Sequence, residues 1–105
     1  MTLASVKRHE DKELRGRILK ALDFSFPAPI SFKMLSYALK SARYDCSSAQ
    51  LKAHLAYLKE KGYVMVEKVG VEDLDIHRDM VKLTVHGKDL VEGNIESEPG
   101  VIIYD

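Results

Sequence analysis

The sequence predicts one small α+β domain, mainly helical, in which a three-helix core is followed by a β-hairpin and a short C-terminal helix. The clearest observation is residues 47–69, where a helical repeat of leucines ends at a glycine and gives way to β-branched and aromatic residues. A second is the alternation of apolar and other residues over 80–85, which indicates a half-buried strand. The length of 105 residues is typical of a single domain.

The third helix has the strongest local signals. Ser47 and Gln50 have the capping-box spacing, in which each side chain satisfies a backbone donor at the helix start. Gly62 ends the helix, because glycine readily adopts the left-handed conformation found there. The apolar residues of this helix fall on one stripe, formed by Leu51, Leu55 and Leu58. We therefore predict a helix over residues 47–61 and a strand over residues 63–69.

The first helix is predicted over residues 10–22, where leucine and isoleucine recur at helical spacing. The first nine residues show no clear period and are expected to be frayed. Pro27 and Pro29 then break the helix, because each proline disfavours α-helical angles in the residue before it.

The second helix is predicted over residues 32–41, with Ser31 as its N-cap. It is expected to bury Leu35, Ala38 and Leu39. The connection to the third helix is short, so the two helices must cross steeply, as they do in a helix-turn-helix.

The second half of the chain predicts a hairpin, a helix and a tail. A loop over residues 70–79 joins the two strands, and a short helix over 85–92 ends before Gly93. We divide the chain into a domain, residues 1–93, and a tail, residues 94–105. The apolar run at the end of the tail needs a partner surface, which is the hairpin sheet, the first helix or another copy of the chain.

Charge is unevenly distributed although the net charge is zero. Residues 1–61 hold 12 Lys or Arg and 6 Asp or Glu, whereas residues 62–105 hold 4 and 10. A basic helical half could face phosphates while the acidic half faces away, and the same pattern also fits an ordinary solvated surface.

Several classes of function lack a starting motif. The four histidines do not have the spacing of a metal site, and Cys46 has no cysteine partner. No phosphate-binding glycine loop or local nucleophile motif is present. We expect no catalytic residues, no cofactor and no metal. No apolar run approaches the length of a membrane span and no signal peptide is evident, so we expect a cytoplasmic protein without a membrane partner.

Two runs carry a resemblance to a known family. The run QLKAHLAYLKEKGYV, residues 50–64, resembles the recognition helix of bacterial winged-helix regulators in its His-Leu pair, in Leu58 and in the closing Gly-aromatic-Val. The run VKLTVHGKDL, residues 81–90, is similar to the Leu-Thr-x-x-Gly-x-x-Leu step that follows the wing in that superfamily. The resemblance implies a winged helix-turn-helix fold, which serves either DNA binding or protein contact.

In the DNA-binding interpretation, the outward ridge of the third helix enters the major groove. Its alanines admit close approach, Gln50 can pair with adenine and Lys52 reaches phosphate. The alternative for the same residues is structural: alanine is a good helix former, Gln50 serves the cap and lysines are simply solvated. His54 is expected to form a hydrogen bond at the edge of the core. The candidate DNA-binding residues are Arg43, Ser48, Gln50, Lys52, Ala53, Tyr57, Lys68 and Arg78.

The predicted wing is unusual for a DNA contact because carboxylates surround its cations. Glu67, Glu72, Asp73, Asp75 and Asp79 all lie in or near it, and they would be repelled by phosphates. The leading interpretation is a small bacterial or phage-type transcriptional regulator that binds double-stranded DNA as a homodimer. The alternative is a winged-helix protein-interaction module, with a protein partner at the acidic wing and no direct DNA contact.

Overall fold

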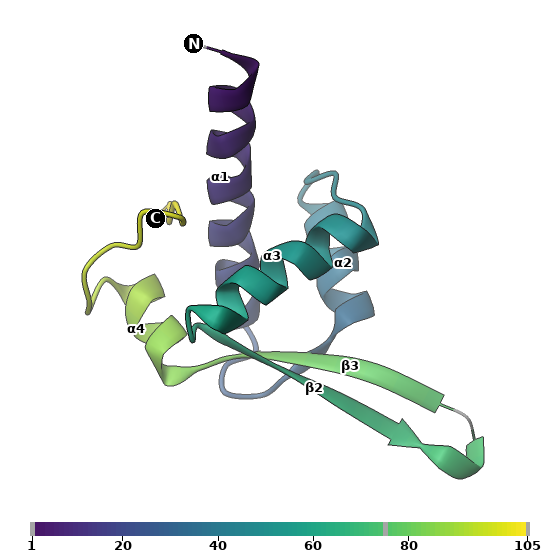
Figure 1. The fold of residues 1–105 in the computed structure, drawn as a ribbon. Coiled ribbons are helices and arrows are strands. Elements are labelled where there is room, and N and C mark those ends of the chain that lie inside the picture. Colours follow the sequence, from purple (N-terminus) through teal and green to yellow (C-terminus); the bar gives the residue numbers. More distant parts are fainter. Residues whose placement is uncertain (1, 75, 105) are drawn as a thin grey trace.

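The computed structural model describes residues 2–74 and 76–104 (Figure 1). These residues form four α-helices, which are α1 (Leu3–Asp23), α2 (Phe32–Ser41), α3 (Ser48–Glu60) and α4 (Val85–Glu92). They also form a three-stranded antiparallel sheet of order β1-β3-β2, built from β1 (Ile30–Ser31), β2 (Val64–Val71) and β3 (Ile76–Leu83). A 3₁₀ turn, Glu72–Leu74, follows β2. The chain is therefore α+β and mainly helical.

The core lies where α1, α2 and α3 meet the base of the β2–β3 hairpin. Each helix contributes its apolar stripe and the hairpin contributes one face, as helical and two-residue periods require. The largest fully buried side chains are Ile18, Leu19, Leu22, Leu35, Leu51, Leu58, Leu83, Val64 and Val81. The outer part of the hairpin extends well beyond this core (Figure 1).

Both ends of α3 form as predicted. The hydroxyl of Ser47 accepts the Gln50 N–H at 3.1 Å, and the Gln50 side-chain oxygen accepts the Ser47 N–H at 2.8 Å. Helices α2, α3 and α4 all end in the same way, with a left-handed residue followed by an N–H that bonds back five residues at 2.8 or 2.9 Å. Those left-handed residues are Arg43, Gly62 and Gly93.

Two predictions for the first two helices are wrong. Helix α1 begins at Leu3, not near residue 10, because the Thr2 hydroxyl caps it by accepting the Ser5 N–H at 3.1 Å. Its first turns are exposed and therefore need no apolar period, while their charged residues are good helix formers. In α2, Leu35 and Leu39 are buried as predicted, but Ala38 is exposed.

The hairpin is longer than predicted and its loop is shorter. Strand β3 begins at Ile76 and pairs with β2 out to Val71, so most of the predicted loop over residues 70–79 is ladder. The first strand of the sheet was not predicted, because its two residues are too few to show a pattern. Strand β3 ends at Leu83, and Thr84 caps α4 by accepting the Gly87 N–H at 3.0 Å.

The tail packs against α1, which is one of the three partners left open by the sequence. The Ile102 N–H donates to the Lys12 carbonyl at 3.1 Å, and the Arg15 guanidinium donates to the Gly100 carbonyl at 3.2 Å. Val101 is buried in the core cluster. Among the described residues, no helix combines the length and hydrophobicity needed to cross a bilayer.

Candidate nucleic-acid interface

The N-terminal half of α3 presents polar side chains on the side away from the core. Leu51, Leu55 and Leu58 anchor the buried side of the helix. Ser48 and Lys52, one turn apart, are exposed. The capping box fixes the start of this helix, so the positions of both side chains follow from local sequence.

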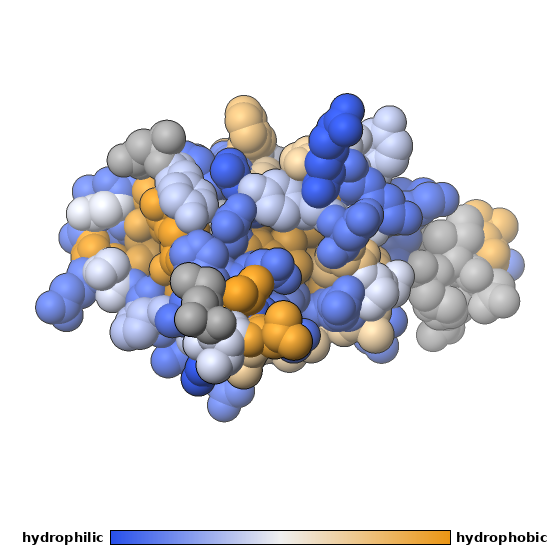
Figure 2. All heavy atoms as spheres, turned by 90° about the horizontal axis from the view of Figure 1, so that it is seen from above, coloured by the Kyte–Doolittle hydropathy of each residue, from blue (hydrophilic) through white to orange (hydrophobic). Residues whose placement is uncertain are grey.

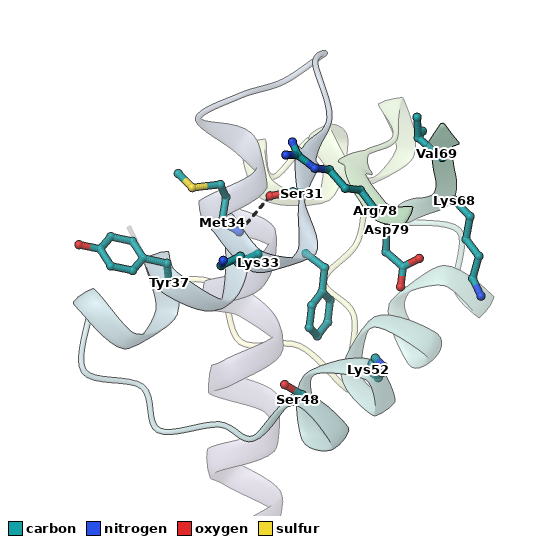
Figure 3. Close-up of a pocket in the computed structure, with 12 residues that line it drawn as sticks. Ser31, Lys33, Met34, Tyr37, Ser48, Lys52, Lys68, Val69, Arg78 and Asp79 are labelled. Atoms are coloured by element: carbon teal, nitrogen blue, oxygen red, sulfur yellow. Dashed lines mark hydrogen bonds between the residues drawn. The ribbon is translucent and has the colours of Figure 1, made fainter. Parts of the chain in front are cut away.

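A hollow of about 1050 Å³ lies between α2, α3 and the β2–β3 hairpin. Figure 3 shows its lining, with Met34 and Tyr37 projecting from α2, Lys52 from α3, and Lys68 and Arg78 from the hairpin. The described residues that line it are Ser31, Phe32, Lys33, Met34, Tyr37, Ser48, Lys52, Lys68, Val69, Gly70, Arg78 and Asp79. Three separate segments of the chain thus meet at one surface.

The charge of this hollow is strongly positive in a chain with no net charge. Among the residues that the structure describes, its lining holds four cations, Lys33, Lys52, Lys68 and Arg78, and one carboxylate, Asp79. The Lys52 ammonium also lies 5.7 Å from the centre of the Phe32 ring, within cation–π range. Cations spread over a large open concavity suit an extended anionic surface better than a small anion.

The hairpin ladder explains how its charged residues reach the hollow. Lys68 and Asp79 are cross-strand partners two residues beyond Val66 and Val81. Since side chains alternate along strands, Lys68 and Asp79 continue the sheet face that packs on the core. Arg78 pairs with Val69 on the other face, and both line the hollow at its edge.

Four of the eight residues selected from the sequence line this hollow, namely Ser48, Lys52, Lys68 and Arg78. Gln50 and Arg43 line a second hollow of about 360 Å³ beside α1. The side-chain oxygen of Gln50 is engaged in the cap, which favours the structural interpretation of this residue. Ala53 is exposed on α3 but lines neither hollow.

Tyr57, also selected from the sequence, lies against α1 and the tail. The Arg15 guanidinium sits 3.9 Å above the centre of its ring, and its hydroxyl donates to the Glu98 carboxylate at 3.4 Å. Gly100 packs directly on the same ring, where an added Cβ would collide with it. The side chain of Tyr57 is therefore engaged by the tail, and this residue is not part of the candidate interface.

His54 forms the core-edge hydrogen bond that its sequence position predicted. It is buried, and its Nδ1 accepts a hydrogen bond from Arg15 Nε at 3.3 Å, while its Nε2 lies 3.7 Å from the Asp11 carboxylate. Burial lowers the pKa of His54, and the Arg15 charge lowers it further, against the opposing effect of Asp11. The neutral imidazole thus links α1 to the buried side of α3.

Glu98 ties the tail to two residues that follow α3 closely, Lys61 and Tyr63. Its carboxylate accepts the Tyr63 hydroxyl at 3.0 Å and lies 3.4 Å from the Lys61 ammonium. Burial and this hydrogen bond raise the pKa of Tyr63 to about 12. Burial would raise the pKa of Glu98, but the Tyr63 and Gly100 hydrogen bonds and the Lys61 charge together lower it.

Sequence reasoning missed the contribution of α2 to the hollow. Lys33, Met34 and Tyr37 lie on its exposed side, and the latter two are large apolar or aromatic residues with more than half of their surface exposed. The signal available in the sequence was that Met34 and Tyr37 fall outside the helical stripe of Leu35 and Leu39. Strand β1 leads directly into α2 and pairs with β3, which sets α2 beside the hairpin.

The acidic residues of the predicted wing divide between described and undescribed parts of the chain. Glu67 and Asp73 are exposed and do not line the hollow, whereas Asp79 does. Asp75 and the side chain of Glu72 lie outside the described residues. No cluster of three potential metal ligands is found among the residues that are described. Cys46 is a free thiol, and burial raises its pKa.

Comparison with known proteins adds no family assignment. Neither a scan against protein-family models nor a search of curated proteins finds a match to this chain.

Proposed function

We propose that this chain is a winged-helix domain that binds double-stranded DNA and acts as a transcriptional regulator, with α3 as the helix that enters the major groove. One observation carries the proposal. Four residues selected from the sequence for DNA contact line one hollow together with Lys33. They are Ser48, Lys52, Lys68 and Arg78. In this reading the β2–β3 hairpin is the wing.

The geometry suggests a division of roles within the interface. The major groove is about 12 Å wide and admits a single helix, so the exposed side of α3 near Ser48 and Ala53 would face base edges. Lys33 and Lys52 would contact phosphates beside α2 and α3. Lys68 and Arg78 would reach the backbone from the hairpin, where such contacts fix position without reading sequence.

Salt dependence of binding to a mixed-sequence duplex tests the proposal. Four cations at phosphates predict a slope of log affinity against log salt of roughly −3 to −4 per domain, from about −0.9 per phosphate. Lys33→Gln and Lys52→Gln should each reduce that slope by about one unit. Fluorescence anisotropy over a salt series measures it.

The matched control is Arg8→Gln, which removes one exposed cation from the far end of α1. It should leave both slope and affinity unchanged. The proposal fails if the chain shows no salt-sensitive binding at low ionic strength, or if Arg8→Gln weakens binding as much as Lys52→Gln does.

A protein-interaction module is the second candidate, favoured by the apolar residues around the same hollow. Met34, Tyr37 and Val69 are 58%, 67% and 48% exposed. Exposed aromatic and methionine side chains are typical of protein interfaces. If DNA binding is absent and Tyr37→Ser abolishes capture of a protein partner that Arg8→Gln retains, this candidate replaces the first.

A further inference from the structure

The exposed half of α1 carries a self-complementary pattern. Leu3, Lys7, Glu10 and Leu14 are spaced by four, three and four residues, so they form one stripe along the helix. When a second copy of the helix lies antiparallel to the first, its stripe runs leucine, glutamate, lysine, leucine alongside leucine, lysine, glutamate, leucine. Each leucine then faces a leucine, and each lysine faces a glutamate. A stripe of this kind is complementary to a second copy of itself in antiparallel orientation.

Most of this stripe is exposed and has no partner among the residues that the structure describes. Leu3 is 90% exposed, and Lys7 and Glu10 are exposed. Within residues 2–74 and 76–104, neither Lys7 nor Glu10 forms an ion pair within 4.0 Å. Figure 1 shows the N-terminal turns of α1 extending past the other helices, and Figure 2, viewed from that end, shows apolar side chains exposed on a largely hydrophilic face.

The tail leaves the stripe free because it packs elsewhere on α1. Ile102 bonds to the Lys12 carbonyl and lies against Gly16. Helical spacing puts Lys12 and Gly16 on the side of α1 opposite the stripe. The apolar surface of the tail is thus already used within the chain, whereas Leu3 remains uncovered.

A hollow lies beside α1 at the position that the N-terminal end of a second, antiparallel α1 would reach. Three of the four stripe residues, Lys7, Glu10 and Leu14, line the hollow of about 360 Å³ beside α1, and Tyr44 lines it too. Leu14 is partly buried against the core. In an antiparallel pairing, Leu3 of the second copy arrives opposite Leu14, which lies in this hollow among mostly polar and charged residues.

We propose that the chain forms a two-fold symmetric homodimer through antiparallel pairing of the N-terminal halves of α1, with Leu3 against Leu14 and Lys7 against Glu10 across the axis. Three helical turns bury less area than a standard interface of roughly 1,200–2,000 Å². The dimer is therefore weak, with a dissociation constant in the micromolar range or above, and it depends on protein concentration. This pairing does not require the proposed DNA binding.

Charge reversal tests the pairing specifically. Lys7→Glu or Glu10→Lys alone places like charges opposite each other twice in the dimer, and each should weaken it by roughly tenfold or more. An equimolar mixture of the two variants restores opposite charges at both positions, so a heterodimer should form with an affinity near that of the unmodified chain. The double variant Lys7→Glu, Glu10→Lys should also dimerise normally.

Arg8→Glu is the control, because it makes the same charge change as Lys7→Glu at an exposed position that helical spacing puts at least about 100° away from the stripe residues. It should not affect dimerisation, whereas Leu3→Ser should weaken it. Sedimentation equilibrium without DNA measures all of these, and circular dichroism confirms that each variant is folded. A chain that stays monomeric up to about 1 mM overturns the proposal. So does a dimer that the single reversals and Leu3→Ser leave unchanged, or one that mixing the two reversals does not restore.

Discussion

Gly16→Ala tests whether the tail stabilises the domain by packing on α1. Gly16 is buried in the middle of α1, and a Cβ there would collide with the carbonyl oxygen and carbon of Ile102. Those atoms are backbone, so no side-chain rotation can relieve the overlap. The substitution must therefore displace the tail from the helix or distort α1.

The expected loss comes from contacts that the tail makes beside Gly16. Breaking the hydrogen bond from Ile102 to Lys12 costs about 1 kcal/mol net, and exposing Val101 costs about 1.5–2 kcal/mol. Alanine is more favourable than glycine in a helix by roughly 0.5–1 kcal/mol, which offsets part of this loss. We expect a net destabilisation of about 1.5–2.5 kcal/mol and a fall in Tm of about 4–8 °C per kcal/mol.

The sign of the effect separates tail packing from helix propensity. In a chain that ends at Gly93, the same substitution should raise Tm, because only the helix preference remains. Amide hydrogen exchange gives a second measurement, since the Ile102 N–H should lose protection in the full-length variant. If Gly16→Ala raises Tm in the full chain and leaves the Ile102 amide protected, the inferred packing of the tail is refuted.

The ends of the helices and the buried histidine give the other predictions. Arg43→Gly should stabilise the fold by up to about 1 kcal/mol, because Arg43 has φ +66° at the position where Gly62 and Gly93 stand in α3 and α4. Gly93→Ala should cost about 1 kcal/mol for strain alone, since nothing lies within 4 Å of the added Cβ. Urea unfolding measures the change in the free energy of unfolding for both substitutions. Changes of the same sign would contradict the reasoning. For His54, burial and Arg15 lower the pKa below its ordinary 6.5, so the unfolded chain binds the proton first and stability falls as pH drops below 6.5. His54→Gln should flatten this dependence; an unchanged slope would show that carboxylates alone cause it.

Local signals were sufficient for α2, α3 and α4. Each starts at a Ser or Thr whose side chain accepts an N–H three residues later, and two of the three end at a left-handed glycine. The stripe of leucines in α3 then fixed which side is buried. Caps and stripes depend on residues that are close in sequence, so the sequence alone predicts them well.

The remaining elements depend on contacts that are distant in sequence or on solvent. The first turns of α1 and the outer hairpin are largely solvated, so neither needs an apolar period to form. Strand β1 exists only because Ile30 and Ser31 pair with Val81 and Met80 of β3. That long-range pairing brings α2 to the hairpin and adds Lys33 and Tyr37 to the hollow, which explains why the sequence did not reveal them.

The zero net charge of the chain is a poor guide to the electrostatic potential at the candidate interface. Two carboxylates are engaged within the fold away from the hollow: Glu98 contacts Tyr63 and Lys61, and Asp23 accepts a hydrogen bond from the Lys88 ammonium at 2.6 Å. None of these residues lines the hollow, where four cations face one carboxylate within the described part of the chain. Exposed charges more than about 10 Å away are largely screened at ordinary ionic strength. The local balance at the hollow, rather than the sum over the chain, therefore decides whether phosphates are attracted, and it favours the proposed DNA contact.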